Sequence, residues 1–178
     1  EDALVRSYAE LENRVIARTS ELTLANEALI EARRFAEGTI EAIPASLAVL
    51  DKNGVILSTN QAWHQFAARN GASPSAVSVG VNYLAVCEAA SGDGTQDAAS
   101  FAEGIRAVMA GDSTRFAMEY ACHSPGQQRW FVGYVTPFAG DGPHSVVIAH
   151  VDVSERKRAE QVIRRLNEEL ETRVEERT

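Results

Sequence analysis

The sequence predicts an α+β domain, in which a five-stranded antiparallel sheet carries helices on one face, between two long flanking helices. All 12 Gly and all 5 Pro lie in one central stretch, which carries 15 charged residues in 115 positions. The two flanks carry 13 charged residues in 37 positions and 14 in 26. Charge-dense segments without Gly or Pro are typical of exposed helices. We therefore expect a helix over 1–37, a globular domain over 38–153 and a second helix over 154–178.

The first flank carries a heptad pattern of apolar residues. The pattern is firmest at Leu11, Val15, Leu22 and Leu29, and a sustained 3.5-residue period favours a coiled coil. At ~1.5 Å per residue this flank would extend about 55 Å, which is too long for the central domain to cover. We expect a homodimer in which the helices of two copies lie parallel. A helix packed on its own domain is the alternative.

Short apolar runs bounded by turn residues mark the elements of the central domain. The segment Asp51–Gly54 is a strong hairpin signal between the first two runs. Residues 76–100 are rich in Gly, Ser and Asp, which suits short helices and loops. The expected elements are strands at 47–50 and 55–58, helices at 60–69 and 101–109, and strands at 115–122, 129–137 and 145–151. This order of elements predicts the antiparallel sheet with helices gathered on one face.

The second flank begins with a helix signal at Ser154, whose hydroxyl can cap the first turn. Leu170 and Val174 lie on its apolar side, where they would extend the dimer seam, although two heptad registers fit equally well. Residues 169–178 repeat residues 10–19 with seven identities in ten positions. A domain with matching connectors at both ends is typical of modules arranged in series.

Three segments of the domain carry a family resemblance. Asp51–Asn60 reads D-K-N-G-V-I-L-S-T-N, and Trp130 begins a W-F pair in the predicted fourth strand. Ala149–Glu160 reads A-H-V-D-V-S-E-R-K-R-A-E, which is similar to the D-I-T-E-R-K-x-A-E exit, or PAC motif, of many bacterial PAS modules. Over residues 38–160 the chain resembles the PAS family of sensor and interaction domains. The L-E-x-R-V-x-x-R-T pattern of both flanks resembles signalling helices that join PAS modules to histidine kinases or cyclases.

The resemblance implies a cytoplasmic signal-transduction module of a bacterial sensor protein. The expected parent is a two-component sensor histidine kinase, with a diguanylate cyclase as the other choice, and the module itself is expected to catalyse no reaction. Its partners would be a second copy and the output domain of the parent chain. A purely structural dimerisation module without a ligand and a flavin redox sensor are the alternatives. The sequence names neither the signal nor the output domain.

The predicted strand faces place Met118, Tyr120 and Cys122 toward the helices, where PAS relatives hold their ligands. The ligand-pocket candidates are Trp63, Phe66, Asn82, Tyr83, Met118, Tyr120, Cys122 and Trp130. Among these, Trp63, Asn82 and Trp130 are the candidates for holding a flavin. We expect the large side chains to fill the pocket, so that no cofactor is bound, and flavin is the open alternative. Asp152, at the end of the last strand, is expected to accept hydrogen bonds from the start of the exit helix and to pass a signal to it.

Other chemistry finds little support in the sequence. Cys122 and His123 are adjacent on a strand and point to opposite faces, so they do not form a catalytic dyad. A metal site from these two residues with His144 and His150 lacks any ligand spacing. In the haem-binding relatives that this family resemblance implies, the iron ligand is a histidine on the helix that corresponds to 101–109 or just before it. No histidine lies there in this chain, so haem is disfavoured. Tyr83 stands where light-sensing flavin relatives carry their reactive cysteine.

Composition excludes further classes. The net charge of −8 and a pI near 5.0 argue against a nucleic-acid-binding surface. Two cysteines are too few for a disulfide scaffold, which favours a reducing compartment. No apolar run approaches the ~20 residues of a membrane-spanning helix, so we expect no direct membrane contact within this chain.

Overall fold

The computed structural model divides the chain into two compact units, Glu1–Ala42 and Ile43–Thr178. The structure describes residues 2–69, 73, 75, 77–90, 95–122, 128–140, 142 and 144–175. Within these residues no helix is long and apolar enough to cross a membrane.

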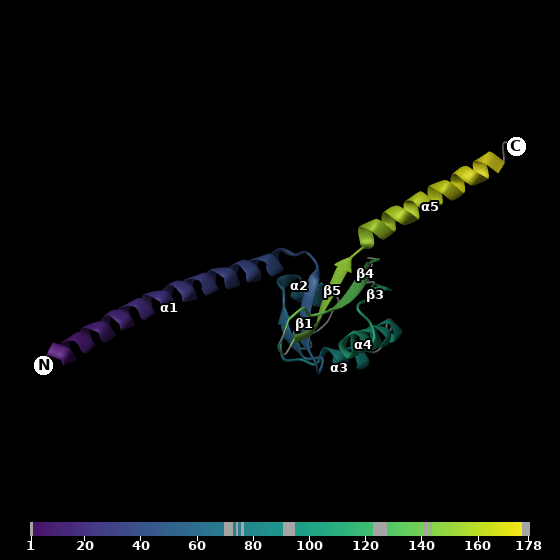
Figure 1. Cartoon of the computed structure of the whole chain (residues 1–178). Helices are drawn as coiled ribbons and strands as arrows, with labels where there is room; N and C mark the ends of the chain where they lie inside the picture. The colour runs from purple at the N-terminus through teal and green to yellow at the C-terminus, as the bar shows by residue number, and fades with distance from the viewer. Residues whose placement is uncertain are drawn as a thin grey trace. The chain divides into compact units, whose positions relative to one another are not determined.

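The first unit is a single helix, α1 (Asp2–Ala42), none of whose residues is buried within the chain (Figure 1). The sequence predicts that this helix ends at residue 37, before a glycine. Gly38 instead lies inside α1, in a position where even an added Cβ would meet nothing within 4 Å. The helix ends shortly before Pro44, whose ring disfavours a helical conformation at Ile43.

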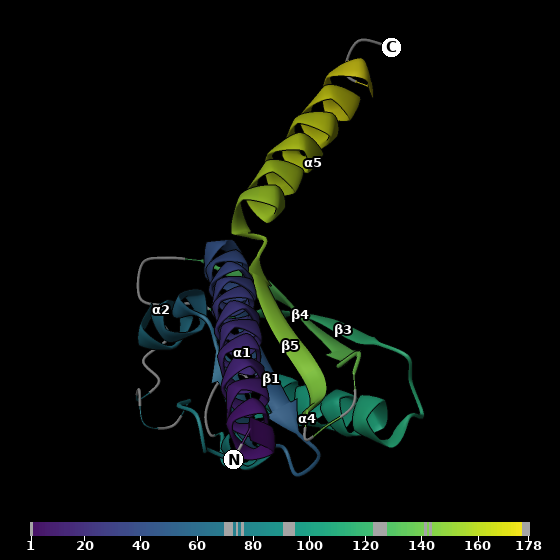
Figure 2. The ribbon, with the colours of Figure 1, turned by 60° about the vertical axis from the view of Figure 1, so that its left-hand side comes forward.

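The second unit is built on a five-stranded antiparallel sheet in the order β2-β1-β5-β4-β3 (Figure 2). The strands are β1 (Ser46–Asp51), β2 (Ile56–Thr59), β3 (Phe116–Ala121), β4 (Trp130–Pro137) and β5 (His144–Asp152). The first strand pairs with the last, so that Leu47 lies opposite Ala149. The predicted five strands, and the pairing of the first strand with the last, are confirmed.

Three helices pack on one face of this sheet: α2 (Gln61–Arg69), α3 (Tyr83–Glu88) and α4 (Thr95–Ala110). α4 begins at Thr95, six residues before the predicted start at 101, so the loop that precedes it is shorter than expected. The helices share one buried apolar cluster with the inward residues of the strands, including Leu50, Ile105 and Ile148. Burial alternates along β4, where Phe131 and Val135 face the helices and Tyr134 faces solvent. The α+β architecture is confirmed.

Two polar side chains shape the entry into the sheet. The carboxylate of Asp51 accepts hydrogen bonds from the backbone N–H of Asn53 and of Val55, both at 2.8 Å, and Gly54 takes a φ of +83°. This geometry closes the predicted hairpin turn. Asn60, fully buried, donates to the carbonyl of Ala45 at 2.9 Å and accepts from the N–H of Leu47 at 2.9 Å. Asn60 therefore ties the start of β1 to the start of α2.

Candidate ligand-binding site

A cavity of about 620 Å³ lies between the sheet and the helices. Six of the predicted pocket residues line it, namely Trp63, Phe66, Tyr83, Met118, Tyr120 and Cys122. Cys87, Phe101 and His150 also line it, and the sequence analysis did not place them there. The expectation that large side chains fill the pocket is wrong, because a volume of this size remains among them.

Gly133 makes room for part of this wall. A Cβ added at Gly133 would lie 2.5 Å from the ring of Phe101 and 3.3 Å from Nδ1 of His150. Since a real Cβ does not approach so closely, only glycine at this position of β4 leaves room for the ring of Phe101 beside His150. The cavity wall therefore depends on the absence of one side chain from β4.

Two predicted pocket residues, Asn82 and Trp130, do not line the cavity. Asn82 caps α3: its side-chain oxygen accepts from the N–H of Ala85 at 3.0 Å, and its amide donates to the carbonyl of Asn53 at 3.0 Å. Trp130 points to the opposite face of β4 from Phe131, because neighbouring strand residues alternate. Of the three flavin candidates, only Trp63 therefore lines this cavity.

His150 is the polar centre of the cavity. It is 4% exposed, and its Nδ1 lies 2.7 Å from the hydroxyl of Tyr120 while its Nε2 lies 3.3 Å from the hydroxyl of Tyr83. The signal for its position was present in the sequence, since Val146, Ile148 and His150 alternate on the buried face of one strand. The sequence suggests this histidine only as a metal ligand, whereas the structure makes it a hydrogen-bonded core residue.

Burial keeps the imidazole, the phenols and the thiols of the cavity uncharged. Burial lowers the pKa of His150 to about 4 and raises the pKa values of Tyr83 and Tyr120 above their ordinary range. Burial also raises the pKa of the Cys87 thiol to about 11. Burial raises the pKa of Cys122 as well, so at neutral pH these groups are a neutral imidazole, two phenols and two thiols.

Aromatic rings surround His150 on several sides. The ring of Phe66 stacks on the imidazole with centroids 5.1 Å apart and planes 4° from parallel. Trp63 and Phe101 lie at 5.5 and 5.2 Å from the same ring. The indole N–H of Trp63 already donates to the carbonyl of Val77 at 3.0 Å, so this residue offers the cavity an apolar ring.

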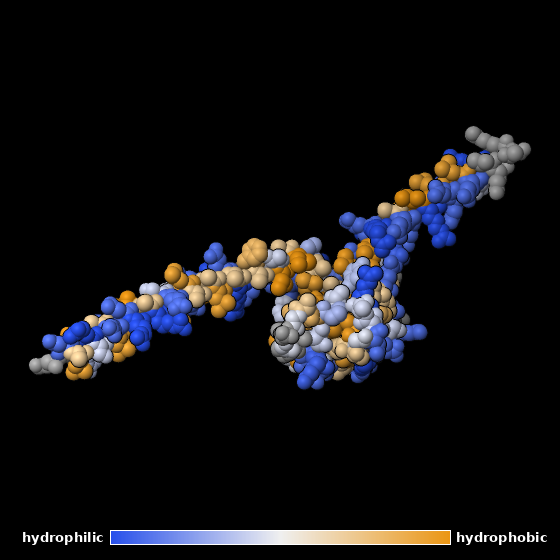
Figure 3. All heavy atoms as spheres, in the orientation of Figure 1, coloured by the Kyte–Doolittle hydropathy of each residue, from blue (hydrophilic) through white to orange (hydrophobic). Residues whose placement is uncertain are grey.

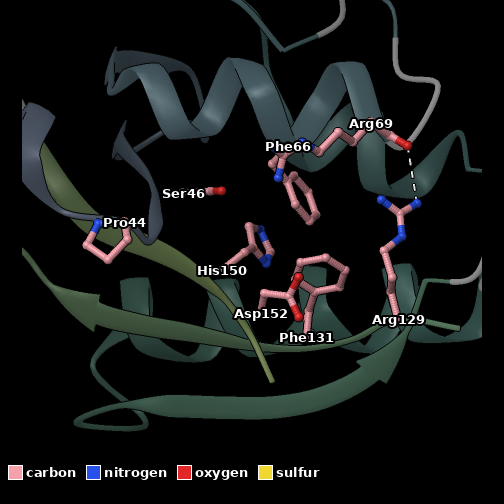
Figure 4. A pocket seen from close by; sticks show the side chains of 8 residues that line it. All are labelled: Pro44, Ser46, Phe66, Arg69, Arg129, Phe131, His150 and Asp152. Atoms are coloured by element: carbon pink, nitrogen blue, oxygen red, sulfur yellow. Dashed lines mark hydrogen bonds between the residues drawn. The ribbon is translucent and has the colours of Figure 1, made fainter. Parts of the chain in front are cut away.

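A second, smaller cavity of about 220 Å³ shares Phe66 and His150 with the first (Figure 4). Its other lining residues are Pro44, Ser46, Arg69, Arg129, Phe131 and Asp152. The guanidinium of Arg129 donates to the carbonyl of Arg69 at 3.2 Å. His150 and Phe66 thus stand between the large cavity and a polar space that reaches Asp152.

The junction between β5 and the last helix, α5 (Ser154–Glu175), borders that space through Asp152. The carboxylate of Asp152 accepts from the N–H of Ser154 at 2.8 Å, which confirms the predicted hydrogen bond. The hydroxyl of Ser154 in turn accepts from the backbone N–H of Trp130 at 3.0 Å. The first residue of α5 is therefore bonded to two neighbouring strands.

A second connection to α5 comes from β3 and was not foreseen from the sequence. Glu119 lies 3.2 Å from the guanidinium of Arg156 and 2.5 Å from the ammonium of Lys157. The hydrogen bond from Lys157, together with these two positive charges, lowers the pKa of Glu119. Glu119 immediately precedes Tyr120, which points into the cavity from the opposite face of the same strand.

The metal and nucleophile combinations raised by the sequence involve residues that the structure describes only in part. His123 and the side chain of His144 lie outside the described residues. Within the part of the chain that the structure describes, no group of three His, Cys, Asp or Glu side chains is placed to hold a metal ion.

Comparison with known proteins places these observations in a family. A model described as the PAS fold matches residues 40–158. An uncharacterized 104.1 kDa protein of Rhodobacter capsulatus is 40% identical over 122 residues, which make up 66% of this chain and 12% of that protein. The chain thus spans only a small part of the length of this relative.

Solved structures share the fold at low sequence identity. A phage VqmA–DPO complex aligns over 82% of this chain and 62% of its own, with 15% identity and a TM-score of 0.51. The PAS domain of BvgS from Bordetella pertussis aligns over 78% of this chain and 98% of its own, with 20% identity and a TM-score of 0.50.

Proposed function

This chain belongs to the PAS fold family, and on that premise we propose that its cavity binds a small molecule and that α5 carries the effect of binding to an output domain. The observation that supports this most is the position of His150. It lines both cavities, and Asp152, two positions along β5, holds the first residue of α5. A ligand that moves the imidazole acts on a strand that ends at the exit helix.

The mechanism we propose is a shift between two packings of α5 on the sheet. Tyr120 and His150 contact the ligand, while Glu119 and Asp152 hold α5 from the same two strands. A ligand that binds one packing better than the other changes their populations by its difference in affinity. Signal transfer therefore needs displacements only in β3 and β5.

The proposed assembly is a homodimer formed through the flanking helices. The seam residues Leu11, Val15, Leu22 and Leu29 are 54–67% exposed on α1, and Leu170 is 59% exposed on α5. Figure 3 shows apolar residues along both helices. The side chain of Val174 lies outside the described residues. Because an exposed apolar stripe of this length is costly in water, a second copy of the same heptad is the partner we propose.

The parent protein we propose is a cytoplasmic sensor histidine kinase or cyclase in a bacterium, with this module supplying no catalysis. The repeated sequence at residues 10–19 and 169–178 supports a module connected on both sides. A ligand-free dimerisation module and a flavin sensor are the remaining alternatives. The positions of Asn82 and Trp130 outside the cavity weigh against the flavin sensor.

A fragment screen with a matched pair of variants tests ligand binding. Ala98 lines the cavity, whereas its neighbour Ala99 is exposed on α4. We expect small aromatic fragments detected by ligand-observed NMR to bind the wild type and Ala99→Trp but not Ala98→Trp, because the indole would occupy the cavity. Equal binding to all three proteins, or no cavity binder in the library, would contradict the proposed function.

A further inference from the structure

We propose that the cavity selects an uncharged aromatic ligand that offers a hydrogen-bond acceptor, such as an amide or lactam carbonyl or a ring nitrogen, to the hydroxyl of Tyr120. This inference rests on the proposed function, since it names the class of molecule that the same cavity binds. It makes Tyr120 the specificity-determining residue of the site.

The hydrogen-bond network around His150 has one more polar proton than it has internal hydrogen bonds. The neutral imidazole carries one N–H, and Tyr83 and Tyr120 carry one O–H each. These three protons serve two internal hydrogen bonds, one at each ring nitrogen of His150. Whichever tautomer is present, one tyrosine donates to the imidazole and the other accepts from it. One O–H is therefore left to donate outward.

The surroundings of the two tyrosines indicate which of the two hydroxyls can donate its proton to a ligand. Tyr83 is 9% exposed, and its hydroxyl also meets the thiol of Cys87, an interaction that adds to the effect of burial on its pKa. Tyr120 is only half-buried and faces the cavity from β3. The arrangement in which Tyr83 donates to Nε2 and Nδ1–H donates to Tyr120 leaves the free O–H at the cavity. A ligand acceptor stabilises this arrangement, because a carbonyl oxygen or ring nitrogen accepts the O–H of Tyr120 more strongly than the sulfur of Cys87 accepts the O–H of Tyr83 in the other arrangement.

The charges around the cavity favour a neutral molecule. The histidine, the phenols and Cys87 are uncharged at neutral pH, so they offer an ion no opposite charge to replace its hydration. Among the described residues that line the cavity, Asp97 is the charged one, and it is only half-buried on the first turn of α4. An anion would be repelled there, and a cation is the rival ligand that an experiment must exclude.

The shape of the site favours a flat ring system. Trp63, Phe66 and Phe101 present aromatic rings from two helices, and aromatic rings pair well with other flat rings in stacked or edge-to-face contacts. A volume of about 620 Å³ lies within the range of pockets that hold small organic ligands. A bicyclic aromatic amide combines the flat shape with the required acceptor.

Three molecules of the same shape separate the charge classes. Naphthamide is neutral, naphthoate is an anion and naphthamidine is a cation, and their affinities for the whole chain are compared by calorimetry at pH 7, with NMR to locate binding. We expect naphthamide to bind at least about tenfold more tightly than either ion, because burying an unpaired charge is costly. A charged analogue that binds as tightly as the amide overturns the proposal. An amidine preference that disappears in Asp97→Asn assigns the site to cations.

The matched variants Tyr120→Phe and Tyr134→Phe test the donor. Tyr134 lies on the opposite, solvent-facing side of the sheet. We expect Tyr120→Phe to weaken naphthamide about threefold to tenfold, the effect of one neutral hydrogen bond, and Tyr134→Phe to change nothing. Unchanged affinity in Tyr120→Phe overturns the role of this hydroxyl. Should this variant fail to fold, the rank order of affinities of the three molecules for the wild type still decides whether the cavity selects an uncharged ligand.

The outcomes also separate this inference from the function on which it rests. If library fragments bind the cavity but naphthamide does not, or ranks below its charged analogues, only the ligand class fails. If Ala98→Trp alters the binding of no fragment and of no naphthalene compound, the proposed function fails with it.

Discussion

His150 is the residue at which the cavity, the sheet and the exit helix come together. Its two ring nitrogens hold tyrosines from α3 and β3, and its ring is stacked on Phe66 of α2. Because it is neutral and buried, protonating it would place a charge among apolar rings. The histidine therefore links the stability of the domain to pH.

The free energy of unfolding should already fall as the pH is lowered from neutral, before the carboxylates begin to take up protons. Burial lowers the pKa of His150 from 6.5 to about 4, so below pH 6.5 the unfolded chain binds a proton that the folded chain does not. The free energy of unfolding is then expected to decrease by about 3 kcal/mol between pH 6.5 and 4. Denaturant titrations at several pH values measure this decrease.

Two variants identify the residue responsible. In His150→Gln the decrease between pH 6.5 and about 5 should disappear, because carboxylates such as Glu119, whose pKa the fold also lowers, take up protons only at lower pH. In His64→Gln it should persist, since His64 is exposed. A pH dependence that survives in His150→Gln would show that another group causes it.

Asn60 should be the polar residue whose loss destabilises the domain most. Its buried side chain bonds the carbonyls of Ile43 and Ala45 and the N–H groups of Leu47 and Trp63. Asn60→Ala leaves these backbone groups without their partner, and we expect a loss of about 3–5 kcal/mol.

The exposed turn residue Asn53 provides the control for Asn60. Asn53→Ala should change the free energy of unfolding by about 0.5 kcal/mol or less. Urea denaturation of both variants makes the comparison, and equal effects would mean that the bonds of Asn60 do not stabilise the entry to the sheet.

At the scale of elements, the alternation of apolar residues was enough to predict all five strands, while tertiary contacts decided the rest. The strand period that correctly placed Tyr120 on the inner face also places Trp130 on the outer face, once Phe131 faces inward. Asn82 caps α3 through the nearby N–H of Ala85, but its second hydrogen bond goes to the carbonyl of Asn53, 29 positions away, and local pattern does not reveal that bond.

Long-range contacts explain the other differences from the sequence-based prediction. The ion pairs of Glu119 join residues that are 37 and 38 positions apart, and local pattern does not bring them together. The cavity itself depends on how the large side chains pack, and their sizes alone suggested that it would be filled.

The contact between β3 and α5 should slow local opening of the exit helix. Glu119→Gln removes the charge that faces Arg156 and Lys157, so we expect faster hydrogen exchange at the amides of the first turns of α5. The control is Glu168→Gln, which breaks the ion pair with Arg164 within α5 and leaves the sheet contact intact. Equal exchange at the start of α5 in both variants would contradict a role for Glu119.

At the scale of the whole molecule, α1 is a long helix that buries no residue within its own chain. A helix of 41 residues that buries none of them gains little from its own chain, since most helical stability in proteins comes from tertiary packing. The two flanks that share a repeated sequence are thus the surfaces at which two copies are proposed to meet.

Replacing Leu22 and Leu29 by Ala should weaken the proposed dimer. Both side chains lie on the apolar seam of α1 and outside the folded domain, so the double variant should become monomeric at lower concentration while its domain stays folded. Light scattering across a dilution series measures the change. A wild-type chain that is monomeric at high micromolar concentration, and unchanged when residues 1–30 are deleted, would contradict the dimer.

The central claim is that a ligand in the cavity changes the local stability of the start of α5. Hydrogen exchange of residues 153–160 tests this claim directly. Exchange is measured with and without a saturating cavity ligand, such as a hit from the fragment screen, in the wild type and in Asp152→Ala, which lacks the bond to Ser154. The account predicts that the ligand changes exchange in this segment of the wild type and that the change is much smaller in Asp152→Ala. Ligand binding that leaves this segment unchanged in the wild type, or alters it equally in both proteins, would contradict the claim.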